Sequence, residues 1–155
     1  MTSERAAPEF RDLDANEMNE LLARNHVGRI AYSFHGRVDI EPIGYVFADG
    51  ALYMRTEPGS KLTTLAHAPW IVLEVDEVRG PFDWRSVVVR GTVYVMREHG
   101  SAADRDAYRH AVDRLRELVP EALTEDDPTP MRQVLVKLYP AELTGRASQS
   151  TPTRH

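Results

Sequence analysis

The run Arg55-Thr56-Glu57-Pro58-Gly59-Ser60-Lys61 brings together the residue types that bind phosphate groups. A strand end, a Pro-Gly turn and a helix start near Ser60 would present unpaired backbone N–H groups at the positive end of a helix dipole. Arg55 and Lys61 would add formal positive charge, and the Ser60 hydroxyl can donate a hydrogen bond to an anion. A plain turn with a serine N-cap and a solvated lysine explains the same residues, so the run alone leaves both interpretations open.

The commoner phosphate-binding motifs do not occur in the chain. It contains no G-x-x-x-x-G-K-[ST] loop, and no strand is followed by the three spaced glycines of a dinucleotide fingerprint. If the run from Arg55 to Lys61 binds a phosphate, it does so within another architecture.

The bulk composition indicates a single domain. A chain of 155 residues can bury roughly 70% of its unfolded surface without disulfide or metal support. We expect a flexible lead over residues 1–12, one domain over residues 13–146 and a flexible tail over residues 147–155. The sequence has no cysteine, which excludes disulfides, thiolate metal sites and a cysteine nucleophile.

The formal net charge of -5 argues against general binding to nucleic acid or to anionic membranes, since both select for basic surfaces. No apolar block that could span a membrane follows the polar first residues. Together with the absence of cysteine, this favours a cytoplasmic location. The six histidines lack the spacing that brings two onto one helical face, so we expect no zinc site.

Alternating apolar residues and turn signals predict antiparallel strands with a few helices. Asp14 and Glu17 form the pattern of a capping box and start a first helix. The dipeptides His35-Gly36 and Asp49-Gly50 indicate two hairpins in series. We expect strands over Val27–Phe34, Arg37–Ala48, Ala51–Thr56, Trp70–Val78, Ser86–Met96 and Arg132–Tyr139, with helices over Ser60–Ala68 and from Ser101 to Pro120.

About six antiparallel strands in a short chain are best protected by closing into a small barrel with helices outside. A phosphate-bearing cofactor would then lie against the outer wall or in a subunit interface. Ser86 and Arg90 share the mixed face of their strand, which suits a cofactor or a partner subunit. Glu74 and Asp76 also share a face and could act as an acid-base pair, although a strand emerging into solvent explains them better.

Five segments of the chain, in order and spacing, resemble the pyridoxamine phosphate oxidase-like split barrels. Within that group the chain is most similar to the nitroimidazole-resistance branch of small flavin-nucleotide-binding proteins. The resemblance covers roughly residues 13–146. The segments are Val27-Gly28-Arg29-Ile30-Ala31, Pro42-Ile43-Gly44-Tyr45-Val46, Arg55-Thr56-Glu57-Pro58-Gly59-Ser60-Lys61-Leu62, Val72-Leu73-Glu74-Val75-Asp76 and Trp84-Arg85-Ser86-Val87-Val88-Val89-Arg90-Gly91.

This resemblance implies a mainly β fold with flanking helices, namely a six-stranded antiparallel split β-barrel of the FMN-binding type. It also implies a homodimer with FMN at the subunit interface. Arg55 and Thr56 would lie on the strand that faces the ribityl phosphate, and Ser60 and Lys61 would hold the phosphate itself. A charge-assisted bond from such a cation is about twice as strong as a neutral one.

Two further segments are assigned to the cofactor by the resemblance alone. One passes the isoalloxazine ring, and the other lies beside the cofactor from the same or the other subunit. In chain order these residues are Pro42, Ile43 and Gly44, then Trp84, Ser86 and Val87.

The function implied is that of an FMN-dependent oxidoreductase that passes electrons from a reduced donor to a small organic acceptor. The flavin ring carries the chemistry in such proteins, so the sequence assigns no catalytic residue. A deazaflavin-dependent reductase and a non-catalytic flavin-binding or storage protein remain as alternatives. A haem protein would need an axial ligand, and no histidine stands in the matched segments.

The chain departs from the family pattern at two places. Arg85 stands between Trp84 and Ser86, where related sequences commonly read Gly-Trp-Ser, and the role of Arg85 stays open. The basic carboxyl-terminal substrate segment of true pyridoxamine phosphate oxidases is not apparent after Gly145-Arg146, which argues against a role in vitamin B6 salvage.

Overall fold

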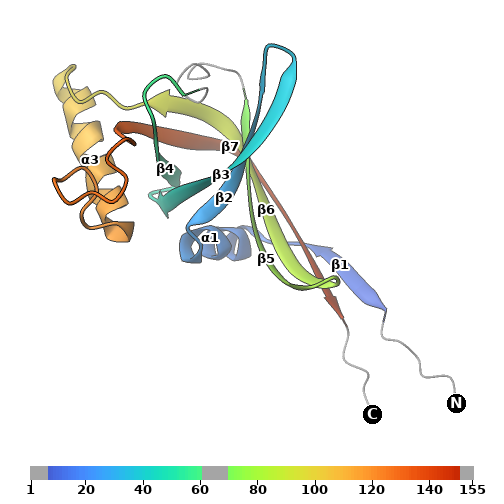
Figure 1. Cartoon of the computed structure of the whole chain (residues 1–155). Helices are drawn as coiled ribbons and strands as arrows, with labels where there is room; N and C mark the ends of the chain where they lie inside the picture. The colour runs from blue at the N-terminus through green and yellow to red at the C-terminus, as the bar shows by residue number, and fades with distance from the viewer. Residues whose placement is uncertain (1–6, 61–69, 151–155) are drawn as a thin grey trace, which may run out of the picture.

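The computed structural model describes residues 7–60 and 70–150. Within these ranges one antiparallel sheet has the strand order β1-β7-β4-β3-β2-β5-β6, and a further pairing of β7 with β6 closes six strands into a ring (Figure 1). The predicted mainly β, six-stranded antiparallel barrel with flanking helices is confirmed. The elements are β1 (Pro8–Asp12), α1 (Ala15–Arg24), β2 (Val27–Phe34), β3 (Arg37–Ala48), β4 (Ala51–Thr56), β5 (Ile71–Gly80), β6 (Asp83–Val95), α3 (Ala102–Leu118) and β7 (Val134–Ser150).

Two tight turns connect the first three strands of the ring. His35 and Gly36 have φ values of 49° and 77°, and Asp49 and Gly50 have values of 54° and 72°. Two successive positive φ values are the signature of a type I′ turn, whose twist matches that of the flanking strands. Both predicted hairpins are therefore confirmed.

The barrel core comes from alternate residues of each strand, and α1 packs against it. Leu21 and Leu22 of α1 are fully buried in the same cluster as Leu73 and Val89. Asp14 and Glu17 form the predicted capping box that fixes the start of this helix. The Tyr45 hydroxyl donates a hydrogen bond of 2.8 Å to the backbone carbonyl of Leu22, which ties α1 to β3.

Helix α3 lies outside the barrel, over β3, β4 and β7 (Figure 1). Ser101 and Asp104 form the capping box that starts this helix. A second hydrophobic cluster joins Ala111 and Leu115 of α3 to Tyr53 and other residues of the outer wall. The helix thus covers one part of the outer wall.

The sheet continues beyond the barrel as a projecting arm, which consists of β1, residues 76–86 and residues 144–150 (Figure 1). The predicted strands Trp70–Val78 and Ser86–Met96 left residues 79–85 between them as a loop, and this is wrong for most of its length. Strand β5 runs to Gly80 and β6 begins at Asp83, so only Pro81 and Phe82 form the turn. Strands β5 and β6 are longer than predicted because Trp84 of β6 pairs with Val78 of β5 on one side and with Ser148 of β7 on the other.

Strand β7 also differs from the prediction, which ended it at Tyr139 because Pro140 follows. The strand continues through Pro140, because a register shift between Arg90 and Gly91 on β6 accommodates the residue that has no N–H group. A Cβ atom on Gly91 would lie 1.9 Å from the Tyr139 carbonyl oxygen. The backbones approach this closely only because residue 91 is glycine.

The expected flexible lead and tail differ from the structure at residues 8–12 and 147–150. These two segments pair with each other, with Pro8 opposite Ser150 and Asp12 opposite Arg146. Residues 8–12 pair only with β7, whereas Ala147 and Ser148 also pair with Arg85 and Trp84 of β6. The helix predicted over Ser60–Ala68 falls almost wholly outside the described residues, as does Lys61.

Replacing Gly91 with alanine is expected to lower the free energy of unfolding by at least about 1–3 kcal/mol. The added methyl group would overlap the Tyr139 carbonyl oxygen and force the backbones of β6 and β7 apart. Urea denaturation of the variant measures this loss. Gly80→Ala is the matched control, since no atom of the residues that the structure describes lies within 4 Å of a Cβ built on Gly80. Equal stability of the two variants would contradict the close approach of β6 and β7.

Candidate functional site

The turn after β4 has the shape that its sequence predicts. The Ser60 N–H group donates a hydrogen bond of 3.2 Å to the Glu57 carbonyl oxygen. Gly59 has a φ of 74°, and Pro58 precedes it, which is the residue pattern of a type II turn. The turn folds the chain back so that the residues on either side of it come together.

The hydroxyl groups of Thr56 and Ser60 meet across this turn. Thr56 Oγ1 donates a hydrogen bond of 2.8 Å to Ser60 Oγ. A hydroxyl can donate one hydrogen bond and accept two, so a pair of them offers a compact polar site at the end of β4. The structure therefore brings together two of the predicted phosphate residues.

Arg55 has a different set of partners from the one that the resemblance implies. Its side chain is 9% exposed, and it forms an ion pair with Asp127. Its Nε donates a 2.9 Å hydrogen bond to the Arg132 carbonyl, and its other nitrogens bond to Asp127 and Thr129. Asp127, Thr129 and Arg132 belong to the loop before β7. A guanidinium has five N–H donors, and the Arg55 guanidinium makes five hydrogen bonds to this loop. Contact between Arg55 and a cofactor stays a prediction.

The loop that holds Arg55 is itself fixed by Asp127. The Asp127 carboxylate accepts hydrogen bonds of 2.8 Å from the Leu123 N–H and 3.0 Å from the Thr129 N–H. Hydrogen bonds from the Arg55 guanidinium, followed by these backbone donors, hold the pKa of this carboxyl well below its usual range. No local pattern in the sequence pointed to this pairing, because Arg55 and Asp127 are 72 positions apart.

The β3 segment assigned to the ring lies beside the end of β4. Pro42 is exposed on the outer wall, whereas Ile43 packs against the barrel core. Gly44 and Arg55 line a small hollow of about 150 Å³ together with residues at the carboxyl end of α3. Among the described residues, the only atom within 4 Å of a Cβ built on Gly44 would be the His26 carbonyl oxygen, at 3.7 Å. The described part of the chain therefore leaves space beside Gly44.

The second cofactor segment lies on β6. Ser86 and Trp84 share its outward face, and Ser86 Oγ donates a hydrogen bond of 2.7 Å to Glu74 Oε2. The Trp84 ring packs against Phe10, with centroids 6.3 Å apart. Val87 points the other way and is fully buried in the barrel core, so only its backbone could approach a cofactor.

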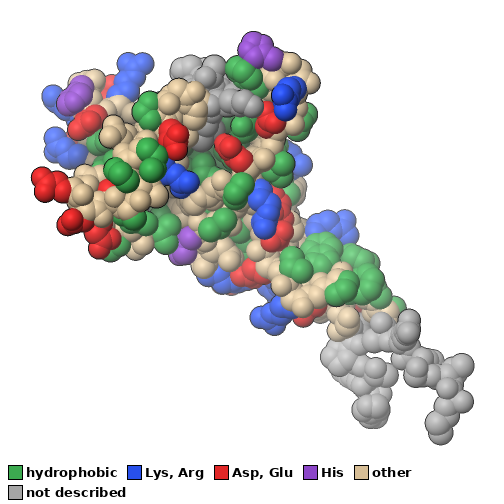
Figure 2. Space-filling model, in the orientation of Figure 1, with side chains coloured by type: hydrophobic (Ala, Val, Ile, Leu, Met, Phe, Trp, Pro, Cys, Tyr) green, Lys and Arg blue, Asp and Glu red, His purple; other side chains and the backbone are tan. Residues whose placement is uncertain are grey.

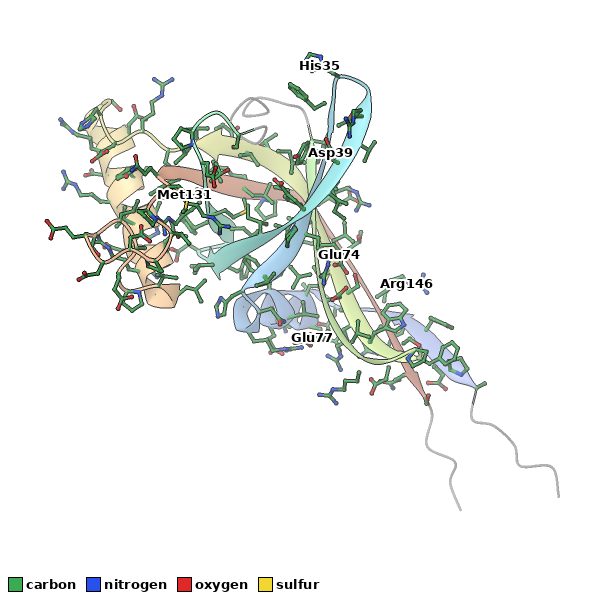
Figure 3. All side chains as sticks on the ribbon, in the orientation of Figure 1. His35, Asp39, Glu74, Glu77, Met131 and Arg146 are labelled. Carbon is green, nitrogen blue, oxygen red and sulfur yellow. The ribbon has the colours of Figure 1, made fainter. Side chains whose placement is uncertain are left out.

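Glu74 and Asp76 belong to a charged cluster rather than to a strand end in solvent. Arg29 Nη1 lies 3.5 Å from Glu74 Oε1 and 3.4 Å from Asp76 Oδ1. Burial raises the pKa of Glu74 and the neighbouring Asp76 adds to this, while the Ser86 hydroxyl and Arg29 oppose it. Figure 3 shows Glu74 on the part of the sheet that leads into the arm. Sequence reasoning missed Arg29 as the shared cation.

Arg85 lies on the opposite face of β6 from Trp84 and Ser86, because neighbouring residues of a strand alternate. It lines a hollow of about 690 Å³ between α1 and the arm, together with Arg24 and Glu77. Arg24 donates two hydrogen bonds, of 2.7 and 2.6 Å, to Glu77. These bonds, with help from Asn25 and the Arg85 charge, lower the pKa of Glu77 to about 2.

The two groups of predicted cofactor residues stand apart on one chain. Residues 42–44 and the turn at 56–60 lie at β3 and β4, whereas Trp84 and Ser86 lie on β6, with β2 and β5 between β3 and β6. Three strand spacings of about 4.8 Å separate β3 from β6 by about 14 Å. The structure therefore does not bring all of the predicted residues to one place.

Two other features bear on the kind of site. In residues 7–60 and 70–150, no group of three or more His, Asp or Glu side chains could hold a metal ion. Among the described helices, none is long and apolar enough to cross a membrane.

In the residues that the structure describes, a closed ring of six antiparallel strands with the helices α1 and α3 packed against it defines a split β-barrel. The chain belongs to the family described as pyridoxamine 5'-phosphate oxidase, whose profile matches residues 14–147. A search of curated proteins finds no match.

Solved structures share this fold over most of the chain. A FAD-binding protein from Mesorhizobium loti is 27% identical, with a TM-score of 0.70, and the match covers 91% of this chain and 99% of that one. The FAD-binding protein from Mycobacterium smegmatis is 25% identical, with a TM-score of 0.63 and coverage of 88% and 99%. A candidate 5-nitroimidazole antibiotic resistance protein from Bacteroides thetaiotaomicron, 16% identical, shares the fold with a TM-score of 0.66 and coverage of 92% and 89%.

Replacing Glu77 with glutamine should change how stability depends on pH. Its folded pKa of about 2 lies below the ordinary value of 4.5, so the carboxylate stabilises the fold above pH 4.5 and loses this effect as the pH falls toward 2. We expect Glu77→Gln to lower the free energy of unfolding at pH 7 by about 1 kcal/mol or less. The variant should also lose less stability than the unaltered protein as the pH falls below 4.5. Urea denaturation at pH 7 and pH 3 measures both effects.

The control for this variant is Glu125→Gln, which removes an exposed carboxylate from the loop after α3. The control should keep the pH dependence of the unaltered protein. If Glu77→Gln behaves in the same way as the control, the Arg24 and Glu77 pair does not contribute to acid stability.

Proposed function

We propose that this protein is a flavin-binding oxidoreductase that passes electrons from a reduced donor to a small organic acceptor. The observation that carries the proposal is the hydroxyl pair of Thr56 and Ser60 at the Pro-Gly turn, close to the space that the described residues leave beside Gly44. Family membership and two relatives described as FAD-binding support a flavin as the ligand.

The residues of this site fit the phosphate end of a flavin. Two hydroxyls at the turn can bond to phosphate oxygens, and Lys61, which follows in the sequence, would add a charge-assisted bond. A bound flavin would supply the electron-transfer chemistry, and the protein would supply binding, orientation and electrostatics. No catalytic side chain is assigned on this account.

FMN is the flavin that the compact phosphate site favours, because FMN ends at a single phosphate. FAD is the second candidate, and the names of the two relatives favour it. A deazaflavin-dependent reductase and a flavin storage protein remain the alternative functions. We also propose that the protein belongs to the nitroimidazole-resistance branch of the family and that it is located in the cytoplasm.

A homodimer with the flavin at its interface is part of the proposal. A second copy could bring its Trp84 and Ser86 to the turn of the first copy, which one chain cannot do across β2 and β5. Helix α3 packs over the Val46 and Ala48 end of β3, so the outward face of β2, β5, the arm part of β6 and the Val38 end of β3 lies outside the cover of α3. Exposed apolar residues stand at both ends of this face, with Arg29 and its carboxylates between them; these residues are Val38, Ile40, Val78 and Phe10.

The arm carries much of this apolar surface, as Figure 2 shows. Phe10, Trp84 and Val78 lie in one row across the sheet, because Ser148 pairs with both Phe10 and Trp84 and Trp84 pairs with Val78. A partner subunit of the same sequence would bury this row, which is otherwise exposed to water.

The test of the proposed function is the visible spectrum of the purified protein, followed by identification of the chromophore released on denaturation. We expect an oxidised flavin spectrum and turnover of nitroaromatics or quinones with a reduced nicotinamide. A haem band, or no flavin binding on titration, would contradict the binding proposal. Flavin binding without turnover of any acceptor would support the storage alternative over the enzyme.

Lys61→Ala should weaken FMN binding by about 1.5–3 kcal/mol, which is the contribution of one charge-assisted hydrogen bond. Titration of flavin fluorescence measures the change. Lys137→Ala is the matched control, since Lys137 is the other lysine of the chain and lies on β7 beside the rings of Tyr53 and Tyr139. Unchanged FMN affinity in Lys61→Ala would remove Lys61 from the phosphate site.

A further inference from the structure

The small hollow at the carboxyl end of α3 has a size and a lining that suit one flat ring. Its volume is about 150 Å³, and an apolar cavity of about that volume can hold a benzene molecule. Figure 3 shows Met131, on the loop before β7, beside α3. The apolar lining comes from the end of the helix and from this loop; its residues are Leu115, Leu118, Val119, Ala122 and Pro128.

Leu118 is the large apolar side chain of this lining that water reaches. It is 38% exposed, whereas Leu115 is 5% exposed and Ala122 is fully buried. A flat apolar ligand in the hollow would cover exposed surface of Leu118, and removal of apolar surface from water favours binding.

Several polar groups of the lining already have partners within the protein. The Arg55 guanidinium makes its five hydrogen bonds to the loop before β7, and Thr129 accepts two of them. At the helix end, the carbonyl oxygens of Leu115 and Val119 accept hydrogen bonds from the N–H groups of Val119 and Ala122. These groups therefore need no ligand as a partner.

Arg132 is a lining residue whose side chain has donors to offer. Its backbone is fixed, because its carbonyl accepts a hydrogen bond from Arg55 and its N–H group donates one to the Thr129 carbonyl. Among the described residues, its exposed side chain has no hydrogen bond or ion pair. The described residues that line the hollow include no aspartate or glutamate. The hollow therefore favours a ring that carries an electronegative oxygen atom.

The hollow touches both segments that the proposed function assigns to the flavin. Gly44 lines it and belongs to the segment assigned to the flavin ring. Arg55 also lines it and immediately precedes Thr56 of the phosphate turn. A molecule in the hollow would therefore lie at the edge of the proposed flavin site, where an electron acceptor has to bind.

We propose that this hollow binds the electron acceptor, a quinone with a single ring, and that Arg132 contacts one of the quinone oxygens. This assignment rests on the proposed function, because it takes the flavin ring to lie along residues 42–44. Conversion of a quinone to a hydroquinone takes up two electrons and two protons. The reduced nicotinamide gives up a hydride, and water supplies the second proton. Negative charge develops on the quinone oxygen, and a cation held beside that oxygen stabilises it.

Calorimetric titration of the flavin-free protein with benzoate tests the hollow, because benzoate is a single ring with a negatively charged oxygen group. We expect saturable binding, which Arg132→Ala weakens by about tenfold. Leu118→Trp should abolish binding by filling the hollow. Arg109→Ala is the matched control, since Arg109 is also exposed, has no partner among the described residues and lines a different hollow. It should leave benzoate affinity unchanged.

Steady-state kinetics of the FMN-loaded protein test the role of the hollow, with 1,4-benzoquinone as acceptor and a reduced nicotinamide as donor. We expect Arg132→Ala to lower kcat/KM for the quinone by about tenfold and to leave the affinity for FMN unchanged. Benzoate should inhibit by competing with the quinone.

Three results would overturn the proposal. Absence of saturable benzoate binding, or an equal loss in Arg109→Ala and Arg132→Ala, would exclude the hollow as the ring site. A matching loss of FMN affinity in Arg132→Ala would place Arg132 at the cofactor instead. Benzoate binding by a protein that binds no flavin would overturn the proposed function and the acceptor role together. Circular dichroism checks the fold of each variant, and Arg132→Ala decides the test if Leu118→Trp does not fold.

Discussion

The pairing of β6 with β7 is the interaction on which the rest of the structure depends. It converts an open sheet into a ring, so that neither strand is left as a long exposed edge. The same two strands continue past the ring and, with β1 and β5, form the arm. The pairing requires a glycine at position 91, because β7 carries Pro140 where the register shifts and its backbone comes too close for a side chain. Barrel closure and the arm therefore both depend on the glycine at position 91.

Closure also positions the candidate site. Strand β4 pairs with β7, and the loop before β7 receives the guanidinium of Arg55 at the end of β4. The turn with Thr56 and Ser60 directly follows Arg55, which lines the small hollow at the carboxyl end of α3 together with Gly44. On the far side of the sheet, Arg29 holds Glu74 and Asp76, and Ser86 bonds to Glu74. The proposed flavin would need both regions, and this is the physical reason to propose a second copy of the chain.

Features that depend on neighbouring residues could be predicted from the sequence, and features that depend on distant partners could not. The turns at Asp49-Gly50 and Pro58-Gly59 and the capping box at Asp14 are each determined within four residues, and the structure has all three. The end of β7 was wrong because a proline usually stops a strand, while its accommodation depends on Gly91 in another strand. The partners of Arg55 and of Glu74 lie 72 and 45 positions away, at Asp127 and Arg29, so no local pattern revealed them.

Sedimentation velocity of the flavin-loaded protein, followed separately by protein absorbance and by flavin absorbance, tests the central proposal most directly. The account predicts that flavin absorbance travels only with a species of twice the 17.5 kDa of one chain, and that dilution which separates the copies also releases the flavin. Flavin that remains bound to a species of 17.5 kDa would contradict it, because one chain would then be enough to hold the cofactor.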